Sequence, residues 1–220
     1  GETTAARLRL ESPLVARARD RFVVRFYSPV VTLGGGRVAE LSPDGGWPDR
    51  TGTWDEVLDG DPSAALRAAT RLAGGRGLPD PEAPVHTGLP ADRIRELGRE
   101  PPDGVVRIGG RFFEEARLSE LRAGLLEELA RMHRERRRSP GASLEALRRS
   151  VGERWAEAAV DRALEHLETA DEIVVDGPTV RLPDHRPILT DEERALKGRL
   201  LGALEEGGLE PPTVGDLEAG

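Results

Sequence analysis

The chain has 220 residues, 37% of them hydrophobic and 33% charged, proportions typical of globular proteins on the polar side. No apolar run approaches the roughly 18 residues that span a bilayer, and cysteine is absent. The sequence therefore excludes membrane helices, disulfides and thiolate metal sites. The net charge of −8 argues against a protein that coats nucleic acid. Positive charge is confined to residues 1–42, with seven arginines against four acids, and to the run Arg131–Arg138.

The first forty residues are predicted to form β-strands. Arg7–Glu11 alternates polar and apolar side chains, which is the period of a half-buried strand. Arg21–Tyr27 is rich in β-branched and aromatic residues. Two further strands, Val30–Leu33 and Arg37–Leu41, are predicted on either side of three glycines, which are expected to form a tight turn or bulge. Since so few strands cannot close a barrel, this segment is expected to be the end of an all-β domain.

A linker is predicted for residues 43–60, which are rich in glycine, proline and aspartate. A short turn of helix near Trp54–Leu58 is expected to end it. The chain then becomes mainly helical, and the same order of elements occurs twice, over residues 61–115 and 116–187.

Each repeat is predicted to contain helices followed by two short strands with a glycine turn. The predicted elements of the first repeat are helices at Pro62–Gly74 and Pro90–Gly98 and a hairpin at Gly104–Glu114. Those of the second are helices at Leu118–Arg136, Ser143–Ser150 and Glu153–Thr169 and strands within Ile173–Leu182. Pro81 and Pro84 fall where the second helix of the first repeat should lie, so that repeat is expected to be degraded.

A third unit is expected over residues 188–220, where the chain supplies a first helix but no wing. Thr190 and Glu193 match a capping box at the start of this helix. Its buried stripe is predicted to consist of Leu196, Leu200, Ala203 and Leu204.

Three helices followed by a two-stranded wing form the winged-helix variant of helix-turn-helix. The predicted fold class is therefore mainly α with β. The last strands of a β-barrel over residues 1–42 are followed by tandem winged-helix domains, of which the last is truncated.

Three segments carry a resemblance to a known family. Arg21–Val38, RFVVRFYSPVVTLGGGRV, resembles the last strands of the third domain of the SelB family of selenocysteine-specific translation elongation factors. That domain is a β-barrel similar to the third domain of elongation factor Tu. Leu182–Pro187, LPDHRP, and Gly208–Pro212, GLEPP, are similar to the segments that lead into later winged helices of the same family.

The resemblance implies a GTPase that uses GTP and Mg²⁺ to carry selenocysteinyl-tRNA to the ribosome at a UGA codon, with the last winged helix bound to an mRNA hairpin. The phosphate-binding motif G-x-x-x-x-G-K-[ST] is absent from this chain, so no catalytic site and no cofactor are expected in it. The chain is expected to be a cytoplasmic, monomeric spacer between the tRNA-binding body and the mRNA-binding winged helices.

Two groups of arginines are candidates for contact with RNA phosphates. The stronger group lies in the predicted all-β segment and consists of Arg17, Arg19, Arg21, Arg25 and Arg37. The alternative is a solvated barrel face with local acidic partners. The weaker group ends the long helix and consists of Arg131, Arg134, Arg136, Arg137 and Arg138. The alternative there is stabilisation of the helix C-terminus by positive charge.

A winged-helix transcription regulator that binds DNA is the competing function. It requires a basic recognition helix, whereas the exposed face predicted for Glu153–Thr169 is acidic. The four histidines, His86, His133, His166 and His185, are far apart in the sequence and lack metal-ligand spacing, so no metal site is predicted.

Overall fold

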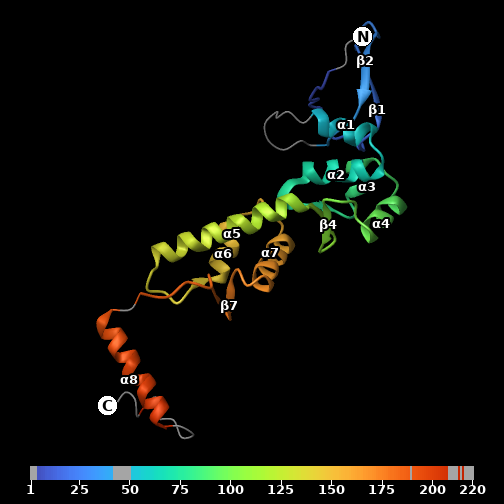
Figure 1. Cartoon of the computed structure of the whole chain (residues 1–220). Helices are drawn as coiled ribbons and strands as arrows, with labels where there is room; N and C mark the ends of the chain where they lie inside the picture. Colours follow the sequence, from blue (N-terminus) through green and yellow to red (C-terminus); the bar gives the residue numbers. More distant parts are fainter. Residues whose placement is uncertain (1–3, 42–50, 189, 208–212, 214, 216–220) are drawn as a thin grey trace.

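The computed structural model describes residues 4–41, 51–188, 190–207, 213 and 215. Figure 1 shows an elongated molecule in which a β-hairpin, two compact helix-and-strand units and a last helix follow one another, with the termini at opposite ends. Within these residues no helix is long and apolar enough to cross a membrane.

The N-terminal hairpin consists of β1, Arg21–Arg25, paired antiparallel with β2, Thr32–Arg37. The three glycines lie inside β2 and pair with β1, so they form no turn. The register of the pair shifts beside them, between Gly34 and Thr32, as it does at a bulge. The strand predicted at Arg7–Glu11 is wrong, and the one at Arg37–Leu41 has only its first residue in a sheet. Alternating polarity is not sufficient for a strand, because a strand also needs a neighbour for its backbone hydrogen bonds.

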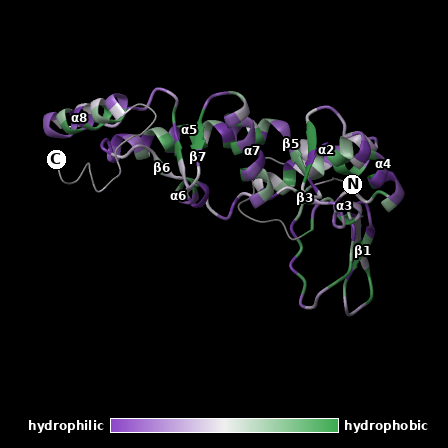
Figure 2. Cartoon of the chain, turned by 90° about the horizontal axis from the view of Figure 1, so that it is seen from below, coloured by the Kyte–Doolittle hydropathy of each residue, from purple (hydrophilic) through white to green (hydrophobic). Residues whose placement is uncertain are grey.

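Both faces of the hairpin carry apolar side chains in contact with solvent. Val23 is 61% exposed, and its neighbour Val24, on the opposite face of β1, is 38% exposed. Figure 2 shows hydrophobic residues along this hairpin, away from the two units. The described residues contain no closed barrel, and these strands contribute little to a core of their own.

The short turn predicted near Trp54–Leu58 is a nine-residue helix, α1, Thr51–Asp59. Val57 of this helix is fully buried against Ala18 and Ala68. Much of the segment predicted as a linker is therefore helical and packs on α2, Pro62–Ala73. Asp61 caps α2 by accepting a hydrogen bond from the Ala64 amide at 2.8 Å.

The two units that follow have the same topology. The elements of the first, after α2, are the 3₁₀ turn η1 (Gly74–Arg76), β3 (Leu78–Pro79), α3 (Ala83–Thr87), α4 (Ala91–Arg99), β4 (Val105–Ile108) and β5 (Arg111–Glu114). The elements of the second are α5 (Glu115–Glu135), β6 (Ala142–Ser143), α6 (Leu144–Ser150), α7 (Glu157–Thr169), β7 (Val174–Asp176) and β8 (Thr179–Arg181). The sheet orders, β3-β5-β4 and β6-β8-β7, are equivalent.

The predicted wings are confirmed, and each gains a two-residue strand that the sequence pattern did not reveal. Gly109 and Gly110 join β4 to β5 with φ angles of 55° and 74°, which only glycine adopts without strain. In the second unit Ser143 caps α6 as predicted, accepting from the Ala146 amide at 3.2 Å. Helix α7 begins at Glu157, four residues later than predicted.

The first unit is only partly degraded. Its second helix, α3, has five residues and contains Pro84, in line with the prediction. All the other elements of a winged helix are nevertheless present and enclose a core that includes Leu66, Ile94 and Phe112. The proline therefore shortens one helix and leaves the topology intact.

The cores of the two units meet across β5. Phe112 belongs to the core of the first unit, whereas its neighbour Phe113 belongs to the core of the second. Successive side chains of a strand point to opposite faces, so a single strand serves both cores. Glu114 ends β5 and Glu115 begins α5, so no linker separates the units.

A second contact between the units lies at η1. The Ala156 amide donates to the Gly75 carbonyl at 3.1 Å, and Gly75 lies so close to Trp155 that a Cβ would be 2.8 Å from the indole. The joint is therefore packed as closely as a protein interior.

The capping box at the start of α8, Asp191–Gly207, is confirmed. The Thr190 amide donates to Glu193 Oε2 at 2.6 Å, and the Glu193 amide donates to Thr190 Oγ1 at 3.1 Å. The predicted buried stripe is wrong, because Leu196 is 46% exposed and no residue of α8 is buried. No other described element covers this face. The segment Gly208–Pro212 lies outside the described residues.

Candidate nucleic-acid interface

Two of the five stronger RNA candidates are used inside the fold. Arg19 has a φ of 71° and donates to the carbonyls of Val57 and Gly60 at 2.8 and 2.9 Å, so its guanidinium binds the end of α1. Arg37 forms a two-point ion pair with Asp59, at 2.7 and 2.8 Å. This hydrogen-bonded pair lowers the pKa of the Asp59 carboxyl.

The other three stronger candidates, Arg17, Arg21 and Arg25, have exposed side chains. No ion pair joins them to a carboxylate within the described part of the chain. Arg21 lies directly opposite Arg37 in the hairpin, and Arg25 lies opposite Thr32. The hairpin therefore keeps two guanidinium groups, Arg21 and Arg25, open to solvent on one strand.

At the end of α5, Arg131 is neutralised by its own helix. Arg131 Nε donates to Glu128 at 2.8 Å, and the same guanidinium also binds Glu135. This hydrogen bond from Arg131 lowers the pKa of the Glu128 carboxyl, with a smaller contribution from charge attraction. The local pairs agree with the alternative in which part of this group stabilises the helix.

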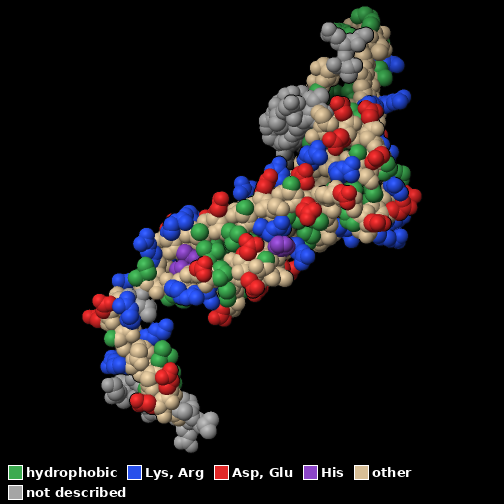
Figure 3. Space-filling view, in the orientation of Figure 1, with side chains coloured by type: hydrophobic (Ala, Val, Ile, Leu, Met, Phe, Trp, Pro, Cys, Tyr) green, Lys and Arg blue, Asp and Glu red, His purple; other side chains and the backbone are tan. Residues whose placement is uncertain are grey.

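Four arginines near the end of α5 are left without an ion pair among the described residues, and they form the open cluster Arg134, Arg136, Arg137 and Arg138. All four are exposed, and Figure 3 shows Lys and Arg side chains gathered around the joint between the second unit and α8. Arg138 also lies near the first turn of α8, where its charge helps to lower the pKa of Glu193, chiefly set by the Thr190 amide.

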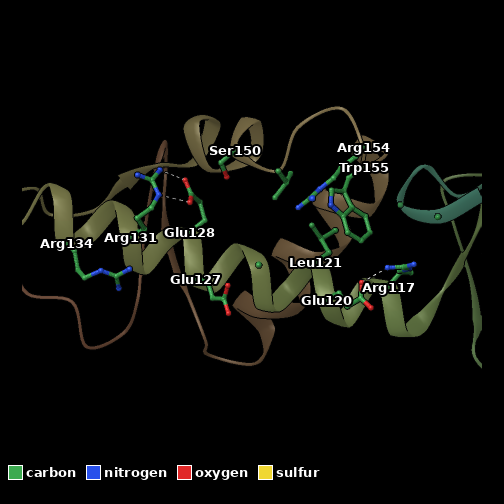
Figure 4. A pocket seen from close by; sticks show the side chains of 14 residues that line it. Arg117, Glu120, Leu121, Glu127, Glu128, Arg131, Arg134, Ser150, Arg154 and Trp155 are labelled. Atoms are coloured by element: carbon green, nitrogen blue, oxygen red, sulfur yellow. Dashed lines mark hydrogen bonds and ion pairs between the residues drawn. The ribbon is translucent and has the colours of Figure 1, made fainter. Parts of the chain in front are cut away.

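A groove of about 720 Å³ runs along α5 where the two units meet (Figure 4). It is lined by Gly124 of α5 and, from the two units that meet there, by Gly75 and Trp155. Arg154 also lines this groove; it is exposed and has no ion pair in the described residues. Arg154 was not among the sequence-based candidates, because it lies in a predicted helix whose exposed face is acidic.

The exposed face of α7 is acidic. Glu157, Glu165 and Glu168 are exposed, and Asp161 is bound to Arg148. A recognition helix in a DNA groove would place these carboxylates against phosphates, and like charges repel. The arrangement therefore disfavours a DNA-binding role for the second unit.

Two of the histidines that are far apart in the sequence are in contact in the fold. The rings of His133 and His185 are stacked, with centroids 3.7 Å apart and planes 14° from parallel. The described residues contain no group of three or more His, Cys, Asp or Glu side chains arranged to hold a metal ion.

Comparison with known proteins matches the chain to one family. A profile described as "Elongation factor SelB, winged helix" matches residues 126–182, which cover most of the second unit. The chain is 28% identical to the selenocysteine-specific elongation factor of Desulfomicrobium baculatum over 223 aligned positions, which cover 97% of this chain and 35% of that protein. The resemblance to the SelB family is confirmed.

A second SelB relative and one solved structure agree. The selenocysteine-specific elongation factor of Escherichia coli strain K12 is 27% identical over 202 aligned positions, 89% of this chain and 32% of that protein. A bacterial selenocysteine-specific elongation factor, EF-Sec, has the same fold, with a TM-score of 0.58 and 15% identity over 96% of this chain and 34% of that one. The chain thus spans about a third of the length of these SelB relatives, and the matches favour SelB over a transcription regulator.

Proposed function

We propose that this chain is the connecting part of a selenocysteine-specific translation elongation factor. It holds the body that carries selenocysteinyl-tRNA at a fixed separation from the winged helices that bind an mRNA hairpin. The chain itself catalyses no step. GTP and Mg²⁺ are bound by another part of such a factor, which acts in the cytoplasm, on the ribosome and as a monomer.

The observation that carries this proposal is the joint between the two winged-helix units. They share β5, they are fused at Glu114–Glu115, and Gly75 packs under Trp155. Helix α5 alone has 21 residues, about 30 Å at 1.5 Å per residue. A stiff connector of defined length raises the effective concentration of one bound end for the other, whereas a poorly matched one lowers it.

The domain boundaries fit this role with one adjustment. Residues 1–42 would belong to the barrel of the tRNA-carrying body, and residues 188–220 would begin the third winged helix. Because α1 packs on α2, the first winged-helix unit would begin near Thr51, and only residues 43–50 would remain as a linker.

The open cluster is the part of the second unit best suited to touch RNA. Its four guanidinium groups keep their charge available, whereas Arg19, Arg37 and Arg131 are bound within the fold. Each phosphate contact releases counterions, so binding through this cluster should weaken as salt rises. Arg17, Arg21 and Arg25 would serve the same purpose on the tRNA side.

RNA binding by the cluster is tested with the double variant Arg136→Glu and Arg137→Glu. We expect affinity for a selenocysteine mRNA hairpin bound to the small ribosomal subunit, measured by fluorescence anisotropy with the full-length factor, to fall at least tenfold in 50 mM salt. Arg95→Glu and Arg99→Glu make the same change of charge on exposed residues of α4 and serve as the control. Equal affinity of the two double variants would contradict the assignment of the cluster.

The connecting role is tested in the reading frame that surrounds this chain. We expect a G-x-x-x-x-G-K-[ST] motif within a few hundred residues upstream and further winged helices downstream. The full-length product should restore decoding of a UGA codon in cells that lack their own selenocysteine factor. A reading frame without the motif, or tight salt-sensitive binding to duplex DNA in a gel shift, would favour the transcription regulator.

A further inference from the structure

The stacked histidines lie at the point where the second unit meets α8. His133 is in the last turn of α5 and is only 7% exposed, and His185 belongs to the segment that follows β8. Neither ring nitrogen of His133 has a hydrogen-bond partner in the described residues. The defined neighbours of this buried imidazole are therefore the stacked ring of His185 and the backbone of Val180.

The stack is one of three contacts that hold residues 182–188 against the end of α5. His185 Nε2 is 2.9 Å from the Ser139 carbonyl, and the Ile188 amide donates to the Arg137 carbonyl at 2.9 Å. The capping box of α8 begins two residues later, at Thr190. These contacts hold the segment that leads towards α8 against the second unit.

The surroundings of the stack favour the neutral form of His133. Burial is the main cause that lowers the pKa of His133, and the nearby His185 lowers it further, while the Val180 carbonyl acts in the opposite direction. The charged neighbours along the packed segments are Arg134 of α5, Arg137 just after it, Arg181 of β8, and Asp184 and Arg186 beside His185. Among the described residues neither ring forms an ion pair with a carboxylate, whereas His86 does with Glu82. One carboxylate against four guanidiniums leaves a positive surplus.

We propose that the His133–His185 stack is a pH-sensitive latch, which holds residues 182–188 against the end of α5, and so keeps the start of α8 near it, while His133 is neutral and releases them when His133 is protonated. Two imidazolium rings at a centroid distance of 3.7 Å repel each other, and burial removes the water that would solvate the charge of His133. The latch goes beyond the connecting role, because it makes the angle of the third unit adjustable.

The pH window follows from the direction of the pKa shift. The released His133 has an ordinary pKa of 6.5, and the latched His133 has a lower one, so the released state takes up its proton first. The stability of the latch is complete above about pH 6.5 and is lost as the pH falls from there towards the depressed value.

The experiment measures the distance between α5 and α8. Because the chain has no cysteine, the substitutions Ala123→Cys and Arg199→Cys at exposed positions give two unique sites for spin labels. Pulsed electron paramagnetic resonance on the full chain should give a narrow distance distribution at pH 8 and a distribution at least twice as broad at pH 5. Circular dichroism at pH 5 should retain the helical signal, which separates release of α8 from general unfolding.

Two variants of His185 make the test decisive. His185→Phe keeps an aromatic ring on His133 but cannot be protonated, so its distribution should broaden less at pH 5 than that of the unsubstituted chain. His185→Ala removes the stack and should be broad at both pH values. His166→Ala, on the exposed face of α7, should respond like the unsubstituted chain. A narrow distribution at pH 5, a narrow distribution for His185→Ala, or loss of the helical signal at pH 5 would overturn the latch.

Discussion

Gly75→Ala is expected to separate the two winged-helix units while leaving each unit folded. Gly75 has no positive φ, so alanine fits its backbone conformation. The new methyl group would, however, lie 2.7 Å from the Arg154 carbonyl oxygen and 2.8 Å from Cε3 of Trp155. Both atoms belong to the second unit, so the strain falls on the joint alone.

The magnitude follows from the size of the overlap. Carbon atoms pack favourably at about 3.5–4.0 Å, so the joint must open by roughly 1 Å to admit the methyl group. Overpacking of this kind typically costs about 1–3 kcal/mol. For a chain of this length each kcal/mol corresponds to a shift in Tm of about 2–4 °C.

The assay is urea denaturation followed by circular dichroism and by the fluorescence of Trp155 in a chain whose other two tryptophans, Trp47 and Trp54, are replaced by phenylalanine. The unsubstituted chain should unfold the two units together, whereas Gly75→Ala should show a second, earlier transition or a lower midpoint. Gly124→Ala is the matched control, because its methyl group meets no atom within 4 Å and lies inside α5. It should stabilise by about 0.5–1 kcal/mol through helix propensity. The packed joint would be refuted if Gly75→Ala were as stable as Gly124→Ala.

Two further substitutions test the assignments of individual side chains. Arg19→Asn keeps a residue that tolerates positive φ but removes both hydrogen bonds to the end of α1, so it should lower the free energy of unfolding by about 1.5–3 kcal/mol in thermal denaturation. Arg21→Asn, on the exposed strand β1, should change that free energy by less than about 0.5 kcal/mol. Equal effects of the two variants would contradict the internal role of Arg19. Ser143→Ala removes the cap of α6 and should lower the free energy of unfolding by about 1 kcal/mol, whereas Ser150→Ala at the other end of that helix should lower it less. If neither variant changes the stability, the cap assigned to Ser143 contributes nothing.

The elements predicted best from sequence are those with local causes. The turn at Gly109–Gly110, the cap at Ser143 and the capping box at Thr190 each depend on residues within a few positions of one another, and all three are confirmed. The apolar stripe of α5 is equally local, because Leu121, Leu125 and Leu129 recur at helical spacing.

The failures concern pairing between distant residues. The two-residue strand β3 exists because Leu78 pairs with Phe112, and the local sequence pattern does not predict so short a strand. Arg7–Glu11 shows the reverse case, in which a good pattern finds no partner strand. The contact between His133 and His185 joins positions 52 residues apart in number and was hidden for the same reason.

The structure leaves fewer arginines as candidates for RNA contact than the sequence does, because a guanidinium group can bind either to groups of its own fold or to a ligand. Arg19, Arg37 and Arg21 all lie in one basic segment, so the sequence pattern alone does not distinguish them. Only the tertiary contacts reveal that Arg19 binds two carbonyls and that Arg37 binds Asp59. Local carboxylates were informative for Arg131, because Glu128 and Glu135 lie three and four residues away.

The direct fusion of β5 to α5 makes the molecule sensitive to insertions at a single peptide bond. A residue added between Glu114 and Glu115 would extend α5 by one position if the helix absorbed it, turning everything beyond by about 100° and advancing it by about 1.5 Å. Phe113 and Leu118 could not then both keep their places in one core. The number of residues at this junction thus fixes the rotation of the second unit about the axis of α5. We therefore expect proteins that share this architecture to accept insertions in the wings and loops more readily than at this junction.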